Sequence, residues 1–316
     1  MDMRPLGRSG LTIAPLVFGG NVFGWTADEP TSFALLDAFV DAGFNAIDTA
    51  DVYSAWAPGN SGGESESVIG RWLKANPAKR EKVLILTKVG SEMGPGKKGL
   101  SSRWIATAVE DSLRRLQTDV IDLYQSHWPD TDTPYEETLG AYAKLIQAGK
   151  VRAIGTSNLN ADQLGQSLTV AKQKGLPRYE TLQPEYNLYD RASYDGPLRD
   201  LAMREGLGVI TYFSLASGFL SGKYRSKADL GQSQRGDRVA KYLDDRGLRI
   251  LAALDQVASG ISAKPAEVAL AWLMAREGVT APIASATSRA QLDSLVKAAH
   301  LKLSPEAIKV LDQASA

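Results

Sequence analysis

The sequence contains no cysteine, and only two of its 316 residues are histidine, His127 and His300. Without cysteine the chain has no disulfides, thiolate nucleophiles, zinc–thiolate sites or iron–sulfur clusters. Two histidines are too few for a metal site built from several imidazoles, so we expect no metal. Any chemistry that this chain performs must therefore use other side chains.

The chain also lacks an excess of charge of either sign, because 36 Lys and Arg residues balance 36 Asp and Glu residues. A balanced chain offers no electrostatic basis for binding nucleic acid or an anionic membrane, and we expect neither as a partner. No uninterrupted apolar run reaches roughly 18 residues, so no membrane-spanning helix is expected. Residues 1–5 lack the apolar stretch of a signal peptide, and we expect a cytoplasmic protein.

What the sequence does contain is a repeated alternation of short apolar runs with segments of helical periodicity. Hydrophobic residues make up 44% of the chain, which suits a large core. Eight of the apolar runs are predicted to be strands, and eight parallel strands close an α/β barrel. The expected strands are 14–18, 44–47, 83–87, 120–124, 151–155, 181–182, 208–211 and 281–283, and the expected helices include 31–42, 64–75, 101–116, 134–148, 161–174 and 264–276.

We therefore predict an α/β fold, a single (β/α)8 TIM-barrel domain over residues 1–316, with an N-terminal β-hairpin at residues 5–13 that caps the barrel bottom. Two segments exceed ordinary loop length: residues 54–63 after the second strand, and residues 217 to about 244 after the seventh. Long loops of this kind commonly carry function. A doubly wound sheet is the alternative fold, but residues 19–24 do not fit the Gly-x-Gly-x-x-Gly spacing that it needs.

Polar side chains stand at the carboxyl ends of the predicted strands, the end at which barrel active sites lie. Asp48 ends the second strand and Tyr53 follows it, Lys88 ends the third strand, and His127 follows the fourth. Each one alone is more commonly a cap, a turn residue or part of the core, but together the four should meet. A nearby ammonium lowers the pKa of a phenol, so Lys88, held by Asp48, would make Tyr53 a general acid. His127 would then orient a carbonyl oxygen or share the proton.

In these motifs the chain resembles the aldo-keto reductases, and it is similar to the branch that contains potassium-channel β subunits. The resemblance implies a barrel that binds NADPH without a Rossmann motif and transfers hydride reversibly to the carbonyl of an aldehyde or ketone, its small-molecule partner. It covers essentially the whole chain and rests on residues 48–53 (DTADVY), the Lys88 strand, residues 124–128 (YQSHW), 155–158 (GTSN), 7–11, 63–70, 149–152 and 218–224.

The resemblance also implies roles for individual residues. The catalytic set would be Tyr53 as the general acid, Lys88 and Asp48 as its tuning pair, and His127. Tyr212 would stack on the nicotinamide ring, Ser157, Asn158 and Gln183 would hold its carboxamide, and Leu215, Ser217, Gly218 and Lys223 would lie along the pyrophosphate. Further cofactor contacts are expected at Gly20, Asn21, Asp48 and Ser214, and the substrate pocket would be rimmed by Val22, Phe23, Trp25, Trp56 and Trp128.

The sequence departs from the family after the eighth strand, where many members carry two cations for the 2′-phosphate of NADPH. Ser285 and Gln291 stand at those positions, and Leu295 replaces a usual asparagine. Arg289 is the only cation in residues 284–291, and we expect it to bind the phosphate together with Ser285, Thr287 and the helix N-terminus. The chain should therefore prefer NADPH over NADH, with NADH as a weaker alternative, by a smaller margin than members with two cations.

Three other functions compete with this interpretation. A Schiff-base aldolase would need Lys88 desolvated and unpaired, whereas Asp48 offers it a charge. A barrel glycosidase would need two carboxylates across the pocket, where His127 and Tyr212 stand instead. A cofactor-holding regulatory subunit of the channel-β type, with little turnover, stays open because its site residues would be the same. The sequence sets no expectation for the physiological substrate or the oligomeric state.

Overall fold

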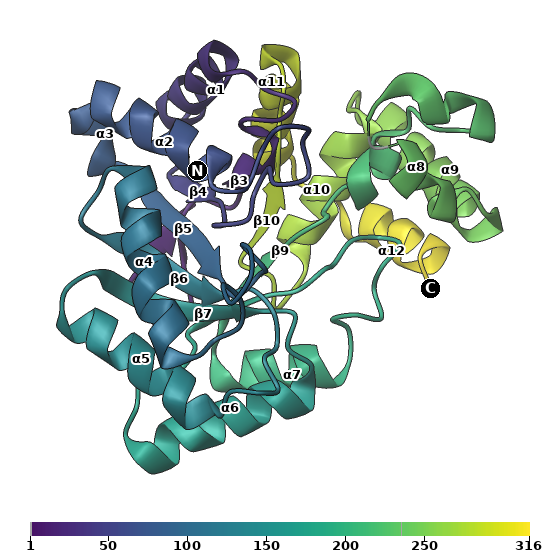
Figure 1. The fold of residues 1–316 in the computed structure, drawn as a ribbon. Helices are drawn as coiled ribbons and strands as arrows, with labels where there is room; N and C mark the ends of the chain where they lie inside the picture. The colour runs from purple at the N-terminus through teal and green to yellow at the C-terminus, as the bar shows by residue number, and fades with distance from the viewer. Residues whose placement is uncertain (1, 235) are drawn as a thin grey trace.

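The computed structural model describes residues 2–234 and 236–316, and its centre is a closed barrel of eight parallel strands (Figure 1). The last strand pairs with both the first and the seventh, for example Ile283 with Val17 and Ala281 with Ile210, which closes the barrel. The predicted fold class is thereby confirmed. In order around the barrel the strands are β3 (Val17–Gly19), β4 (Ala46–Asp48), β5 (Leu84–Val89), β6 (Ile121–Ser126), β7 (Val151–Ser157), β8 (Thr181–Gln183), β9 (Gly208–Thr211) and β10 (Ala281–Ala284).

Helices surround these strands and cover the outside of the barrel (Figure 1). The predicted boundaries of α2 and α6 agree with the structure, whereas α1 begins two residues earlier than predicted. It does so because Asp28 accepts a hydrogen bond from the Thr31 amide and a proline occupies the first turn. The helices next to the strands are α1 (Glu29–Asp41), α2 (Glu64–Ala75), α3 (Pro77–Arg80), α4 (Ser102–Leu116), α5 (Tyr135–Gln147), α6 (Ala161–Lys174), α7 (Pro197–Glu205), α10 (Pro265–Ala275) and α11 (Arg289–His300).

The first barrel strand is shorter at its start than predicted. Residues 14–16 belong to the connection from the hairpin, and the Ala14 amide donates to the side-chain oxygen of Asn45 at 2.9 Å. The Asn45 amide nitrogen in turn donates to the Thr12 carbonyl. The Asn45 side chain therefore forms hydrogen bonds with the Ala14 amide and the Thr12 carbonyl, which would pair with another strand if this segment were part of the sheet.

The predicted hairpin is present as β1 (Arg4–Pro5) and β2 (Thr12–Ile13), which pair antiparallel. Its residues Leu6, Leu11 and Ile13 are buried among the side chains that fill the barrel interior. Gly7 has φ +61° and lies so close to Gly208 that a Cβ would be 2.6 Å from the Gly208 nitrogen. Because Gly208 begins β9, the hairpin closes the amino-terminal end of the barrel, opposite the strand ends that carry the site.

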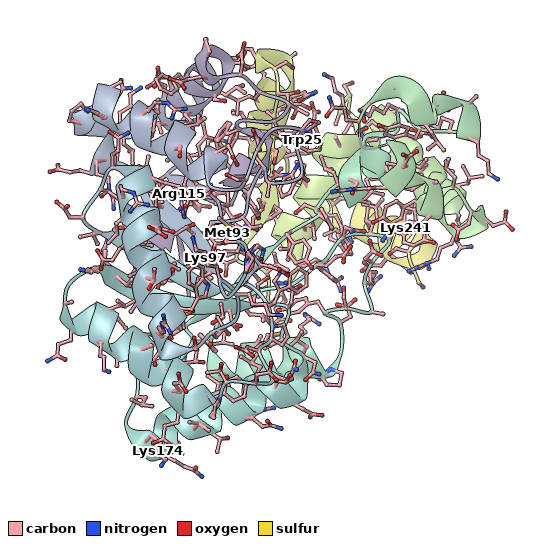
Figure 2. The ribbon with its side chains drawn as sticks, viewed as in Figure 1. Trp25, Met93, Lys97, Arg115, Lys174 and Lys241 are labelled. Carbon is pink, nitrogen blue, oxygen red and sulfur yellow. The ribbon has the colours of Figure 1, made fainter. Side chains whose placement is uncertain are left out.

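The long segment after β9 contains more regular structure than predicted. It forms η2 (Ala216–Ser221), η3 (Lys227–Gln232), α8 (Gly236–Val239) and η4 (Ala240–Tyr242), followed by α9 (Asp245–Gly260). Phe219 and Tyr242 are buried and stack at 5.4 Å, which anchors the segment. Figures 1 and 2 show α8, α9 and Lys241 to one side of the barrel, near the C-terminal helix α12 (Pro305–Ala314). Within the described residues, no helix has both the length and the apolarity needed to cross a bilayer.

Candidate active site

The centre of the site is a buried ion pair at the carboxyl ends of β4 and β5. The Lys88 ammonium lies 2.8 and 2.7 Å from the two carboxylate oxygens of Asp48 and 2.8 Å from the Thr49 carbonyl oxygen. It also lies 3.0 Å from the hydroxyl oxygen of Tyr53, and that hydroxyl is 3.4 Å from Asp48 Oδ2. Both charged side chains are almost completely buried. The geometry therefore fixes the phenol between a cation and an anion.

The direction of the Tyr53 pKa differs from the sequence expectation. Burial raises the pKa of Tyr53 well above its usual value of 10, and the neighbouring Asp48 carboxylate raises it further. We expected Lys88 to lower this pKa, but Asp48 lies next to both groups and its charge offsets that of the ammonium. Burial also lowers the pKa of Lys88, an effect that Asp48 opposes. Tyr53 is therefore fully protonated near neutral pH and holds a proton that it can donate.

His127 follows β6 and faces the same point. Its ring lies 6.0 Å from the Tyr53 ring, centroid to centroid, and its Nδ1 is 3.0 Å from the Ser91 hydroxyl oxygen. The Asn158 amide nitrogen donates to the His127 carbonyl oxygen at 2.9 Å, which fixes the backbone. Burial and the Lys88 charge lower the pKa of His127 well below 6.5, so the ring is neutral. With Nδ1 engaged by Ser91, the Nε2 atom is the one that can meet a ligand.

A cavity of about 1040 Å³ opens above these residues. This volume is at the upper end of small-molecule pockets, which measure about 300–1,000 Å³, and it suits a ligand as large as a dinucleotide. Most of the predicted binding residues line the cavity: Asn21, Val22, Trp25, Asp48, Trp56, Trp128, Ser157, Asn158, Gln183, Tyr212, Ser214, Leu215, Ser217, Gly218, Lys223, Ser285, Thr287 and Gln291.

Three predicted contact residues do not line the cavity. Phe23 is fully buried and stacks on Phe18 at 5.3 Å, so it belongs to the core beneath the rim. Gly20 lies behind the site, where a Cβ would be 2.9 Å from the Asp48 carbonyl oxygen. The side chain of Arg289 is 73% exposed and pairs with Asp293 at 2.7 Å, one turn along α11. Phe23, Gly20 and Arg289 thus lie outside the lining of this cavity, and their contacts with substrate or cofactor stay predictions.

The residues predicted to hold a carboxamide are joined to one another and to the ion pair. The Tyr212 hydroxyl donates to Asn158 Oδ1 at 2.6 Å, and the Ser157 hydroxyl donates to the Gln183 carbonyl at 2.7 Å. The Gln183 side-chain nitrogen donates to Asp48 Oδ1 at 2.9 Å. This network supplies the amide and hydroxyl groups with which a carboxamide forms hydrogen bonds.

The turn after β9 has an unusual backbone conformation. Ala216, Ser217 and Gly218 follow one another with φ of 48°, 57° and 101°, in the left-handed region. Within this turn the amides of Ala216 and Gly218 already donate to the carbonyl oxygens of Phe213 and Leu215, at 2.7 and 2.9 Å. A Cβ on Gly218 would be 3.8 Å from Lys223 Cε, so the lysine side chain passes beside the turn. The ammonium of Lys223 is thus the group beside this turn that suits an anion such as a pyrophosphate.

The cavity also contains residues that sequence reasoning missed. Ser91 lies in the loop after β5, and nothing in the local sequence distinguishes it from any other loop serine. Arg238 lies within the segment after β9, which the sequence marked only as a long loop. The other additions are Gly19, Thr26, Val52, Glu185, Phe213, Ser221, Ser233, Gln234, Ala266, Ile283, Ala284, Ser294 and Leu295.

Comparison with known proteins places this site in a family. Residues 15–316 match the Aldo/keto reductase family. The chain is 35% identical to "Uncharacterized oxidoreductase YrpG" of Bacillus subtilis (strain 168), over 99% of this chain and 95% of that protein. It is 33% identical to a "Probable voltage-gated potassium channel subunit beta" of Oryza sativa subsp. japonica, over 99% and 96%. It is 30% identical to the L-glyceraldehyde 3-phosphate reductase of Escherichia coli (strain K12), over 99% and 92%.

Proposed function

The chain belongs to the aldo/keto reductase family, and from this membership we propose that it reduces the carbonyl group of an aldehyde or ketone with NADPH. Its oxidoreductase class follows from the family; the cofactor, the mechanism and the substrate are the proposal. The observation that carries the proposal is the contact of the Tyr53 hydroxyl with the buried Lys88–Asp48 pair beneath a dinucleotide-sized cavity.

In this mechanism NADPH, when bound, supplies the hydride, and the side chains of the protein handle the proton. Tyr53 donates its proton to the carbonyl oxygen as negative charge develops there. The ammonium of Lys88, 3.0 Å away, stabilises the phenolate that remains, and Asp48 holds the ammonium in place. Neutral His127 donates a hydrogen bond from Nε2 and orients the carbonyl oxygen.

The proposed cofactor fits the described lining residues. Asn158 and Gln183 would bind the carboxamide, Tyr212 would stack on the nicotinamide, and the turn at 216–218 with Lys223 would bind the pyrophosphate. Ser157, Ser214, Leu215, Asn21 and Ser285 line the cavity between these points. A dinucleotide bound in this way would place its ring next to Tyr53.

Aromatic side chains point to the proposed class of substrate. Trp56, Trp128 and Phe213 line the cavity although 41%, 49% and 40% of their surfaces are exposed. Trp25 packs edge-on against Trp56 at 5.7 Å, and Figure 2 labels it on the side of the barrel that faces α8 and α9. Covering exposed aromatic surface around a cavity with an apolar ligand removes that surface from water, which favours binding. We propose a carbonyl compound with an apolar or aromatic substituent.

NADPH oxidation measured over a panel of aldehydes and ketones tests the proposed function. Turnover of apolar or aromatic carbonyl compounds supports it. A protein that binds NADPH tightly but turns over none of the panel would instead match the second candidate, a cofactor-holding subunit similar to the Oryza sativa channel β protein. A lysine adduct trapped by borohydride with a carbonyl substrate would favour an aldolase.

Replacing Ser91 with alanine should lower kcat/KM by about 2- to 13-fold, the effect of losing a hydrogen bond of about 0.5–1.5 kcal/mol. The variant removes the partner of His127 Nδ1, so the ring loses its preferred tautomer and orientation. Steady-state kinetics with the best carbonyl substrate measures the effect, and Ser91→Thr, which keeps the hydroxyl, should restore most of the activity. Wild-type kcat/KM in Ser91→Ala would show that the serine does not position His127.

Replacing Tyr212 with alanine should weaken NADPH binding by about 1–3 kcal/mol, the scale of aromatic stacking on a base. Tyr212→Phe keeps the ring and loses only the hydrogen bond to Asn158, so its affinity should stay much closer to wild type. Quenching of tryptophan fluorescence by NADPH, with Trp25 and Trp128 in the cavity wall, reports the affinity. Equal affinities for wild type and Tyr212→Ala would mean that the ring does not contact the cofactor.

A further inference from the structure

A further acidic residue, Asp51, is buried next to the Lys88–Asp48 pair. Asp51 follows β4, its backbone amide donates to the Lys88 carbonyl oxygen at 3.2 Å, and 1% of its surface is exposed. Within residues 2–234 and 236–316, neither carboxyl oxygen of Asp51 has a hydrogen-bond partner of normal geometry. An ionised carboxylate is costly in such a place, because a buried charge needs a partner.

Glu66 on α2 is the acidic neighbour of Asp51, and direct contacts fix its charge. Its Oε2 accepts a hydrogen bond from Arg115 Nε at 2.7 Å, and its Oε1 accepts one from the Thr87 hydroxyl at 2.6 Å. Arg115, which Figure 2 labels, lies in the last turn of α4. A Cβ on Gly63 would be 2.5 Å from Arg115 Cδ, so the start of α2 holds the arginine side chain in place. Glu66 is therefore a carboxylate paired with Arg115.

The buried charges around Asp51 balance without it. Lys88 pairs with Asp48. Arg115 pairs with Glu66, so each of these two cations already has a carboxylate of its own. A third carboxylate would give the group a net negative charge away from water. Burial accordingly raises the pKa of Asp51 well above its usual value, and the Glu66 charge raises it further, against smaller opposing effects of the two cations.

Three phenols also face Asp51. Tyr53 follows it on the same segment, Tyr124 stands on β6 and Tyr142 on α5, and burial raises the pKa of each of them. All three are neutral near pH 7, so they do not compensate a charge on Asp51. For Tyr53, a negative charge on Asp51 would act in the same direction as that on Asp48 and hold the phenol proton more tightly.

We propose that Asp51 stays protonated near neutral pH and acts as a positioning residue for Lys88. Its neutral side chain leaves the ammonium of Lys88 to Asp48 and Tyr53. This proposal rests on the proposed function, because it takes Tyr53 as the acid whose phenolate the ammonium stabilises. An ionised Asp51 would add a negative charge near that phenolate and weaken Tyr53 as an acid. Glu66 prevents this, because its carboxylate opposes the ionisation of Asp51.

The pH dependence of unfolding tests the charge state of Asp51 without cofactor or substrate. A carboxyl that is protonated in the folded protein and ionised in the unfolded chain favours unfolding as pH rises from about 4 toward its raised folded pKa. Asp51→Asn imitates the neutral acid and lacks this titration. Between about pH 5 and pH 7, the unfolding constant of wild type relative to that of Asp51→Asn should increase by up to about tenfold per pH unit in urea titrations. A ratio that stays constant or falls would show a carboxylate at Asp51 and overturn the proposal.

Steady-state kinetics with the best carbonyl substrate tests the positioning role. Glu66→Gln removes the carboxylate that opposes ionisation, so Asp51 becomes the partner of Arg115 and takes up a negative charge. We expect kcat to fall about 3- to 10-fold, because one unit in the pKa of Tyr53 changes its acid strength tenfold and the rate by less. The double variant Glu66→Gln, Asp51→Asn removes that charge again and should restore kcat to within about twofold of wild type. Asp51→Asn alone should also stay within about twofold.

Asp122→Asn is the matched control for Glu66→Gln. Asp122 is likewise a buried carboxylate paired with an arginine, Arg80 at 2.9 Å, but it stands near the start of β6, away from the strand ends that carry the site. This variant should lose stability and keep the kcat of wild type.

The kinetic outcomes that overturn the positioning role are defined. A kcat that does not recover in the double variant would show that Glu66 only supports the fold, and a loss beyond about tenfold in Asp51→Asn alone would show that the site needs a carboxylate there. A wild-type protein without turnover would contradict the proposed function, and with it the role assigned to Asp51. The unfolding measurements would still determine whether Asp51 is protonated.

Discussion

Replacing Tyr53 with phenylalanine is expected to lower kcat by about 10²–10⁴-fold, the usual contribution of general acid catalysis. The hydroxyl contributes when charge develops on the carbonyl oxygen, so its removal costs transition-state stabilisation. The ring and its contacts with Trp56 and His127 remain in the variant. Cofactor affinity should therefore change little, and single-turnover measurements of NADPH oxidation with saturating cofactor would report the loss directly.

The matched control for this variant is Tyr189→Phe. Tyr189 also donates its hydroxyl to a carboxylate, that of Asp244 at 2.7 Å, but it does not line the cavity. Loss of the Tyr189 hydroxyl should therefore leave kcat unchanged. A decrease below tenfold in Tyr53→Phe would be too small for a general acid, and the proton would then have to come from another donor.

Replacing Lys88 with methionine is expected to abolish most activity and to destabilise the protein by about 3–5 kcal/mol. The stability loss arises because Asp48 would remain buried with its charge unpaired, after losing two contacts of 2.8 and 2.7 Å. The activity loss arises because the phenolate of Tyr53 would lose the ammonium 3.0 Å away. Urea-induced unfolding and steady-state kinetics measure the two effects separately.

The double variant Asp48→Asn, Lys88→Met distinguishes these two causes. It removes the unpaired carboxylate, so it should be more stable than Lys88→Met alone, yet it should stay inactive. Recovery of activity together with stability would mean that Lys88 only maintains the fold.

In Lys88→Met, the pKa of Tyr53 should rise further, because no cation remains to favour the phenolate. A pH profile of kcat that keeps its alkaline limb where wild type has it would contradict the coupling of Lys88 to Tyr53.

Much of the fold and the centre of the site could be predicted because their signals are local. The alternation of apolar runs and helical segments is visible in the sequence itself. Parallel strands in a closed barrel bring their carboxyl ends to one face. Asp48 ends β4 and Lys88 is the last residue but one of β5, and these neighbouring strands pair with Asp48 opposite Leu86. Once the barrel closes, a contact between their side chains follows from the topology.

Other features depended on packing between distant segments. Phe23 and Trp25 stand two residues apart in the same loop, yet Phe23 stacks on Phe18 in the core while Trp25 lines the cavity. Residues 217–244 are predicted only as a long loop, whereas in the structure the segment contains short helices and buries Phe219 and Tyr242. The spacing of Arg289 and Asp293 already allowed an ion pair along one helix face, and the structure contains that pair.

The sequence by itself determined the barrel, its hairpin cap and the residues that surround the buried ion pair, because periodicity and strand order are properties of the chain. The tertiary structure decided which charges face the cavity and how they titrate. The pKa of Tyr53 depends on burial and on the shared position of Asp48, and these distances exist only in the folded protein. Arg238 on α8 lines the cavity, a placement that no local pattern in the sequence marks.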